Sequence, residues 1–116
     1  MKLIIAGGRD FDDYEMMCMV LDEDLFKQPV TEVVCGEAKG ADALGKRWAI
    51  EHKIPVTSYP AKWDFYGPAA GPIRNAEMAR YTDTAIVFWD GKSFGTSNMI
   101  ANMERLKKPF HVIKYP

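Results

Sequence analysis

Four short segments of this chain combine glycines with basic or hydroxyl side chains, a pattern typical of sites for anionic ligands. They are Gly7-Gly8-Arg9, residues 36–42, residues 71–75 and residues 90–96. Glycines let a backbone approach a ligand closely, and each segment lies where a helix is expected to begin. The first amides of a helix are unpaired and carry partial positive charge, so they attract phosphate groups. The chemistry that these residues could perform is therefore the binding of a phosphate or a nucleotide.

The segment 36–42 shows how such a site would be built. The apolar run Val33-Val34-Cys35 stops at Gly36, a second glycine follows at Gly40, and an amphipathic run begins at once. This is the pattern of a buried strand, a tight turn and a helix start. Most α/β proteins use glycine in such turns, so the segment alone is equally compatible with a structural corner and with anion binding.

Residues 40–46 also match the letters GxxxxGK of a P-loop, but the match fails on chemistry. The next residue is Arg47, which has no hydroxyl for a magnesium ion. The four middle residues carry the apolar stripe of a helix and therefore do not form a loop. We reject a P-loop here.

Apolar runs of strand length alternate along the chain with amphipathic runs of helix length. We expect strands at residues 2–6, 32–35, 54–59, 84–89 and 110–113, and helices at about residues 13–27, 41–52, 73–81 and 97–107. Strands that are apolar on both faces are typical of a parallel sheet with helices on both sides. The fold class is therefore α/β: three αβα layers around five parallel strands, doubly wound in the order 3-2-1-4-5.

The first helix, at residues 13–27, should be capped by Asp10 or Asp12, because short carboxylates accept hydrogen bonds from free amides. Its apolar stripe contains Met16, Met17, Val20, Leu21 and Leu25 or Phe26. Met19 adds a third methionine, and the three cannot all face one core. A broad buried stripe and a subunit interface are both compatible with this pattern.

The ends of the later helices carry candidate site residues. Pro72 is expected at the first position of the helix 73–81, which would place Arg74 and Asn75 in its first turn. A cation in that turn opposes the helix dipole, so Arg74 is a poor choice for stability and a candidate for function. Thr96 is expected to cap the last helix.

The predicted topology brings the four segments together. In the order 3-2-1-4-5 the first and fourth strands are neighbours, and ligands bind beyond the carboxyl ends of the strands at this switch point. Each segment follows one of the first four strands and so lies at the same edge of the sheet. We expect a cleft for a phosphate or nucleotide there.

Length and composition limit the alternatives. The 116 residues fit one domain (1–116), and 47% hydrophobic and 27% charged residues are typical of a globular protein. A net charge of -1 makes nucleic acid an unlikely partner, and no apolar run is long enough to span a membrane. The N-terminus has a single Lys2 followed by an expected strand, which is not the pattern of a signal peptide. The two cysteines form no CxxC motif, so we expect a cytoplasmic protein with reduced thiols. The two histidines have no ligand spacing, and we expect neither a metal nor a cofactor.

The four segments together resemble the YspA-like, cpYpsA-related group of the SLOG superfamily. The resemblance rests on IIAGGRDF at residues 4–11, GxxKGAD at 36–42, AAGPIRN at 69–75 and FWDGKSxGT at 88–96. It implies a Rossmann-like fold that binds nucleotides or nucleotide-derived ligands. The superfamily includes DprA, the LOG phosphoribohydrolases and sensor domains of conflict systems, and this group occurs in bacteria, plasmids and phages.

The chain departs from these patterns in two places. The group usually reads Gly-Gly-x-Arg-Gly-Ala-Asp in its second segment, where this chain has Glu37 for a glycine and Lys39 for the arginine. Lysine keeps the charge but loses the bidentate fork, and Glu37 brings a negative charge towards the expected phosphate. The phosphoribohydrolases carry an acid after their Gly-Thr, whereas Ser97, Asn98 and Met99 follow Thr96 here. If the loops correspond, that catalytic carboxylate is missing.

Two functions follow, and the first is favoured because of the missing acid. The chain is expected to be a sensor or sequestering module for a nucleotide or nucleotide-derived phosphate ligand. The alternative is a small nucleotide hydrolase or phosphoribohydrolase, with Glu37, Asp42 and Asp90 as candidate catalytic acids. The expected ligand-binding residues are Gly7, Gly8, Arg9, Gly36, Glu37, Lys39, Gly40, Asp42, Arg74, Asn75, Asp90, Ser93, Gly95 and Thr96. The methionine-rich helix and the habits of the superfamily favour a homodimer or higher homo-oligomer.

Overall fold

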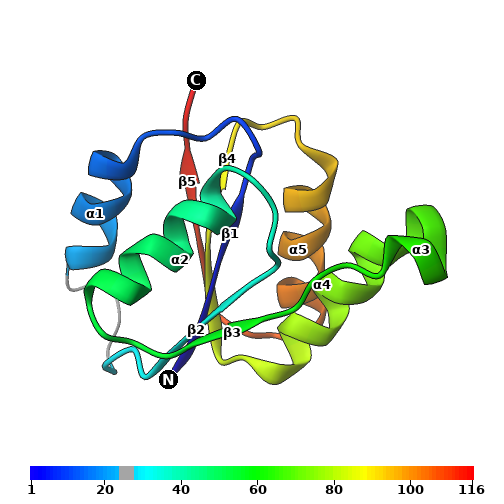
Figure 1. Ribbon diagram of the computed structural model, residues 1–116, viewed down its shortest axis with the longest axis horizontal. Helices are drawn as coiled ribbons and strands as arrows, with labels where there is room; N and C mark the ends of the chain where they lie inside the picture. Colours follow the sequence, from blue (N-terminus) through cyan, green and yellow to red (C-terminus); the bar gives the residue numbers. More distant parts are fainter. Residues whose placement is uncertain (24–27) are drawn as a thin grey trace.

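The structure is a computed structural model, and it describes residues 1–23 and 28–116. Within these residues, five parallel strands form one sheet between two layers of helices (Figure 1). The strands are β1 (Lys2–Gly7), β2 (Glu32–Cys35), β3 (Val56–Ser58), β4 (Thr84–Trp89) and β5 (Phe110–Lys114). Their order is β3-β2-β1-β4-β5, which confirms the α/β, Rossmann-like class and the predicted order 3-2-1-4-5.

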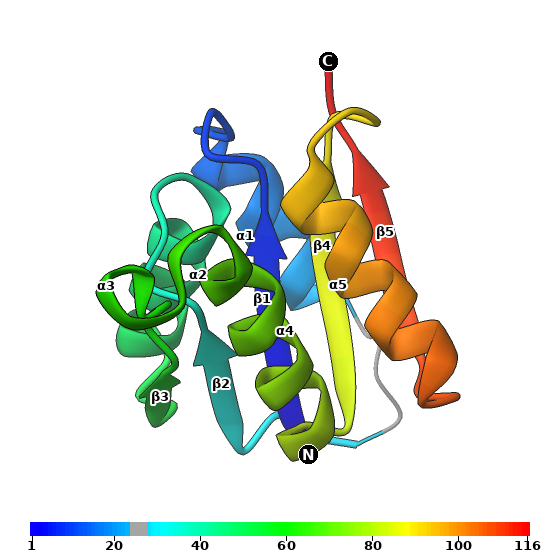
Figure 2. The ribbon, with the colours of Figure 1, turned by 90° about the vertical axis from the view of Figure 1, so that its right-hand side faces the viewer.

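Helices cover both faces of the sheet because the central strands carry apolar side chains on both. The helices are α1 (Tyr14–Asp22), α2 (Ala41–Glu51), α3 (Trp63–Tyr66), α4 (Ala70–Tyr81) and α5 (Phe94–Arg105), with a 3-10 turn η1 (Gly67–Ala69) before α4. Ile5 of β1 packs in the cluster that contains Trp48 of α2, whereas Ile4 packs in the cluster that contains Met78 of α4. Figure 2 shows α4 and α5 together over this second face. No helix in the described part of the chain is both long and apolar enough to cross a membrane.

The register of the sheet sets up the switch point. β1 pairs with β2 on one side and with β4 on the other, so that Ile4 lies between Val34 and Ala85. All pairings are parallel, and the carboxyl ends of β1, β2 and β4 therefore reach the same edge. The chain leaves β1 and β4 towards opposite faces, which opens a crevice between their following loops.

The first helix differs from the expectation at both ends. Its N-cap is Asp13, whose carboxylate accepts a hydrogen bond from the amide of Met16 at 3.0 Å, so the expected caps at Asp10 and Asp12 are wrong. Asp10 instead accepts a hydrogen bond from Tyr115. The helix ends at Asp22, where acidic side chains oppose the helix dipole, and Leu25 and Phe26 of the expected stripe lie outside the described residues.

The three methionines of α1 divide between core and surface. Met17 is fully buried and Met16 packs against the same cluster, but 63% of Met19 is exposed. Single apolar side chains are common on protein surfaces, so the exposure of Met19 alone does not indicate a subunit interface. The expected homo-oligomer stays a prediction.

Two later helices begin three residues earlier than expected. α4 starts at Ala70, because the turns α3 and η1 lead directly into it, so Pro72 is its third residue and Arg74 lies in its second turn. α5 starts at Phe94 with Ser93 as N-cap, so Thr96 is not the cap. β3 is shorter than predicted, as the proline at position 55 has no amide for the ladder.

Candidate ligand-binding site

A cleft of about 310 Å³ lies beyond the carboxyl ends of β1 and β4, at the predicted switch point. We call it the switch-point cleft. All four glycine-containing segments contribute to its walls. The expected site residues that line it are Gly7, Arg9, Asp42, Arg74, Asn75, Ser93, Gly95 and Thr96.

A second hollow of about 340 Å³, the side hollow, adjoins this cleft on the β2 side. Its walls include Gly36, Glu37 and Lys39, which do not line the cleft itself. The two spaces share four residues: Arg9, Ala38, Trp63 and Arg74. The expected site residues that line neither space are Gly8, Gly40 and Asp90.

The loop from β2 to α2 is shaped by the carboxylate of Asp42. Its Oδ2 atom accepts hydrogen bonds from the amide of Gly36 at 3.0 Å and from that of Ala38 at 3.3 Å. Burial raises the pKa of Asp42, whereas the two amides and the positive charge of Arg74 act in the opposite direction. Asp42 therefore belongs to the wall of the cleft and also holds its loop in place.

Arg74 ties three segments together from α4. Its Nη1 atom donates to the carbonyl of Gly36 at 2.5 Å and to that of Tyr59 at 3.3 Å, and its Nε atom donates to Asn75 at 3.0 Å. Gly36 permits this approach, since a Cβ atom there would lie 2.3 Å from Nη1. Asn75 in turn donates to the carbonyl of Gly95 at 3.2 Å and so joins the start of α5 to this network. The guanidinium of Arg74 is thus placed by the fold before any ligand binds.

Arg9 brings a second positive charge to the same place. Its side chain is exposed, and among the described residues no carboxylate oxygen lies within 4.0 Å of the charged nitrogens of Arg9 or Arg74. Burial is the main cause that lowers the pKa of Arg74; the charge of Asp42 opposes this effect, and that of Arg9 adds to it. Two neighbouring cations without an ion-pair partner create a local positive potential that an anion would neutralise.

Glu37 is turned away from these arginines. Its backbone has a positive φ of 62°, a conformation that glycine adopts more readily than other residues. Its carboxylate lies 3.1 Å from Nζ of Lys46 and accepts a hydrogen bond from Ser58. These two contacts lower the pKa of Glu37, with the Ser58 hydroxyl as the main cause. The sequence suggested that the negative charge of Glu37 would repel a bound phosphate. In the structure this charge is paired with Lys46 instead.

Replacing Glu37 with glutamine should reduce stability only where the carboxylate is ionised. Because the folded-state pKa of Glu37 is lowered, ionised Glu37 adds stability that is fully present above its unfolded-state pKa and is lost as the pH falls through the lowered folded-state pKa. An exposed ion pair contributes about 0.5 kcal/mol, so we expect E37Q to lower the Tm by about 2–4 °C at pH 7. Thermal unfolding followed by circular dichroism at pH 7 and at a series of acidic pH values measures the difference, and a loss that does not shrink as the pH falls would contradict the assignment.

The loop from β4 to α5 is held by Asp90. Its Oδ1 atom accepts hydrogen bonds from the amides of Lys92 and Ser93, both at 2.8 Å, and these bonds lower the pKa of Asp90. Ser93 makes no side-chain cap to α5. Helix geometry leaves the first amides of α5 without intrahelical acceptors, and the residues at 93–96 line the cleft. This end of the cleft thus offers backbone donors to an anion.

Sequence reasoning missed two aromatic residues of the cleft wall. Trp63 of α3 and Phe94 of α5 both line it, and 48% of Trp63 and 78% of Phe94 are exposed. The aromatic run at residues 62–66 was a usable signal for Trp63, because long loops with such side chains are often functional. Phe94 stands between two expected site residues, Ser93 and Gly95, and nothing in its own pattern distinguished it.

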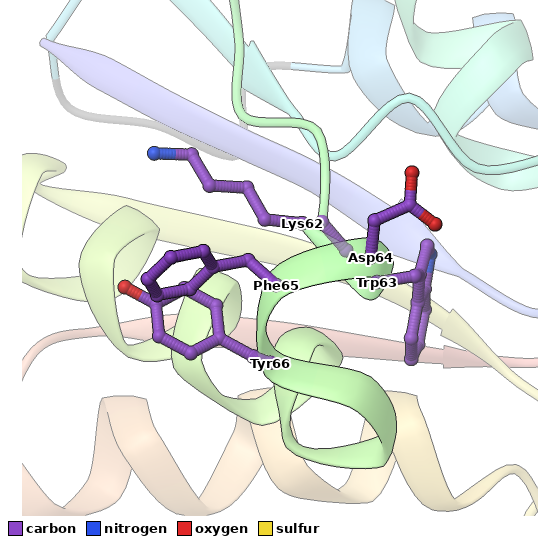
Figure 3. Close-up of a pocket in the computed structure, with 6 residues that line it drawn as sticks. Lys62, Trp63, Asp64, Phe65 and Tyr66 are labelled. Atoms are coloured by element: carbon purple, nitrogen blue, oxygen red, sulfur yellow. The ribbon is translucent and has the colours of Figure 1, made fainter.

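A third hollow, of about 490 Å³, lies around α3 and is lined by residues 61–66 (Figure 3). All of its walls come from this one short segment, so no second element contributes chemistry to it. Figure 3 shows Phe65 and Tyr66 on one side of α3 and Trp63 with Asp64 on the other. The switch-point cleft is the better candidate site because several elements converge on it. In the described part of the chain, no group of three or more His, Cys, Asp or Glu side chains is arranged to hold a metal ion.

Two comparisons with known proteins found sequences similar to this chain. The family model described as "YspA, cpYpsA-related SLOG family" matches residues 1–66, which contain β1, the Asp42 loop and α3. The "Gene 61 protein" of Mycobacterium phage D29 is 31% identical over 115 residues, which cover 93% of this chain and 92% of that protein. No solved structure shows significant similarity to the chain.

Proposed function

Because the chain belongs to the YspA, cpYpsA-related SLOG family, we propose that it binds a nucleotide or a nucleotide-derived phosphate ligand in the switch-point cleft. In this role it acts as a sensor or sequestering module. Family membership supports nucleotide-related binding in general, and the cleft supports its location.

The pair of cations formed by Arg9 and Arg74 carries this proposal. Both residues line the cleft and the side hollow, and no carboxylate lies within ion-pair distance of either guanidinium in the described part of the chain. The charge of Asp42 acts on Arg74 without such a contact, and it can compensate at most one of the two positive charges. Holding like charges together is unfavourable unless an anion compensates them. The amide groups at the start of α5, whose residues also line the cleft, supply further donors.

A hydrolase at the same cleft is the second candidate, and Asp42 favours it. Asp42 is the candidate acid that lines the cleft, and its raised pKa suits a general acid. Against this, the carboxylates of Glu37, Asp42 and Asp90 all accept hydrogen bonds that hold loops. Binding without turnover therefore remains the first proposal.

Replacing Arg9 with glutamine should weaken nucleotide binding while leaving the fold intact, because this side chain is exposed and forms no hydrogen bond or ion pair with the described residues. A charge-assisted hydrogen bond contributes about 1.5–3 kcal/mol, so we expect about a 10-fold to 100-fold loss of affinity for a nucleoside monophosphate. Isothermal titration calorimetry with AMP, GMP, CMP and UMP at low salt measures this loss of affinity. R80Q is the matched control, because Arg80 lies on the exposed face of α4 and its replacement should leave the affinity unchanged.

The same nucleotides distinguish the two candidates. Incubation with the protein followed by chromatography should return each nucleotide unchanged. Release of free base or phosphate would favour the hydrolase, and equal affinity of the wild type and R9Q would contradict the proposed role of Arg9.

A further inference from the structure

Trp63 occupies an unusual position among the three tryptophans of the chain. The indole nitrogen of Trp48 donates to Asp22 at 3.3 Å, and that of Trp89 donates to the carbonyl of Ser93 at 3.1 Å. No hydrogen-bond acceptor for the indole of Trp63 is found among residues 1–23 and 28–116. About half of this side chain is exposed, although tryptophan is among the most favourable residues to bury.

The surroundings of Trp63 place its ring beside the arginine pair. Trp63 lines both the switch-point cleft and the side hollow, together with Arg9 and Arg74. A large flat aromatic surface is therefore shared by two spaces whose walls also contain both cations. This is the combination that recognises a nucleotide, since the base has a π-face and the phosphate has negative charge.

The ring is held in this position by α3 and α4. A Cβ atom on Gly71 would lie 3.3 Å from Cη2 of the indole, so the benzo edge packs on the start of α4. The amide of Gly67 donates to the carbonyl of Trp63 and closes the turn of α3. Figure 3 shows the ring on the side of α3 away from Phe65 and Tyr66. An aromatic ring fixed at one edge by backbone is a preorganised stacking surface.

We propose that the ligand is a nucleoside monophosphate whose base stacks on Trp63 while its phosphate lies between Arg9 and Arg74. This inference rests on the proposed function and adds the recognition of the base. The size of the cleft, about 310 Å³, lies at the lower end of the range for small-ligand pockets, roughly 300–1,000 Å³, and suits one nucleotide. Phe94 lines the same cleft from α5 and supplies a second exposed ring.

The test compares wild type, Trp63→Leu and Trp63→Phe. Leucine keeps an apolar contact with Gly71 but removes the aromatic surface, whereas phenylalanine keeps a ring. Base stacking on an aromatic side chain contributes about 1–3 kcal/mol, so W63L should bind AMP about 5-fold to 150-fold more weakly, and W63F should recover much of this loss. Ribose 5-phosphate, which has no base, should bind the wild type more weakly than AMP by a similar factor.

Fluorescence separates stacking from a merely structural role. A stacked base should quench the emission of Trp63 on addition of AMP, and this quenching should vanish in W63F although AMP still binds by calorimetry. Trp48 remains in that variant as an internal reference, whereas Trp89 donates to the cleft residue Ser93 and measures any quenching that does not come from Trp63. Far-UV circular dichroism confirms that each variant is folded.

The failures of the two proposals can be distinguished. If the wild type binds none of AMP, GMP, CMP and UMP but binds a nucleoside diphosphate, a nucleoside triphosphate or ADP-ribose, this inference alone is overturned. If it binds none of these compounds, the proposed function is overturned as well. If AMP binds the wild type and W63L equally well, or if ribose 5-phosphate binds the wild type as tightly as AMP, this inference alone is overturned. Quenching of the same size in W63F as in the wild type also overturns it.

Discussion

Replacing Gly40 with alanine should lower the free energy of unfolding by more than about 3 kcal/mol, a large part of the roughly 5–15 kcal/mol typical of a domain. Gly40 has a φ of +75°, in the left-handed region, which costs other residues about 1–2 kcal/mol. A Cβ atom there would lie 2.2 Å from the carbonyl oxygen of Gly8 and 2.6 Å from the carbonyl carbon of Arg9. These are backbone atoms that cannot rotate away, so two loops of the cleft must separate. Urea unfolding at pH 7 measures the loss.

Gly67 is the matched control for this substitution. It also has a positive φ, of +59°, but no atom lies within 4 Å of a Cβ built on it. G67A should therefore cost only the backbone strain, about 1–2 kcal/mol. Equal losses of unfolding free energy for G40A and G67A would contradict a steric clash between a side chain at position 40 and the backbone of Gly8 and Arg9.

The sheet was predictable because each strand had a strong, simple signal. β1, β2 and β4 are short runs that are apolar on both faces, and such runs occur in parallel sheets covered by helices. Handedness and connectivity then leave few possible orders for alternating strands and helices. Helix ends were less predictable, because Asp10, Asp12 and Asp13 are equivalent in local sequence. Only the path of the chain after β1 decides that Asp13 caps α1.

The meeting of the four segments was also predictable, because it follows from topology alone. The role of each side chain within them was not. Glu37 pairs with Lys46 and Ser58 because its backbone has a positive φ. A positive φ is expected at a glycine, so the sequence gives no sign of it at a glutamate. The position of Trp63 depends on α3, a single turn within a segment that the sequence marks only as a long loop. Short turns carry little periodicity, so their side chains cannot be assigned to a face.

Replacing Arg74 with methionine should have the second large effect, a loss of about 2 kcal/mol in the free energy of unfolding together with loss of nucleotide binding. Methionine fills similar space but donates no hydrogen bond, so the carbonyls of Gly36 and Tyr59 lose their guanidinium donor. A part-buried acceptor without a donor costs about 1–3 kcal/mol. Asp42 also loses the positive charge that opposes the effect of its burial, which disfavours the ionised carboxylate in the loop.

Two further variants show whether Arg74 acts through the loop at Gly36. R80M makes the same substitution on the exposed side of α4 and should change stability by less than about 0.5 kcal/mol. In G36A a Cβ atom would lie 2.3 Å from Nη1 of Arg74, so the guanidinium must move and both stability and binding should fall. In the R74M background the same glycine substitution should cost less, because the group that it displaces is gone. Additive losses for G36A and R74M would contradict a direct contact between these two positions.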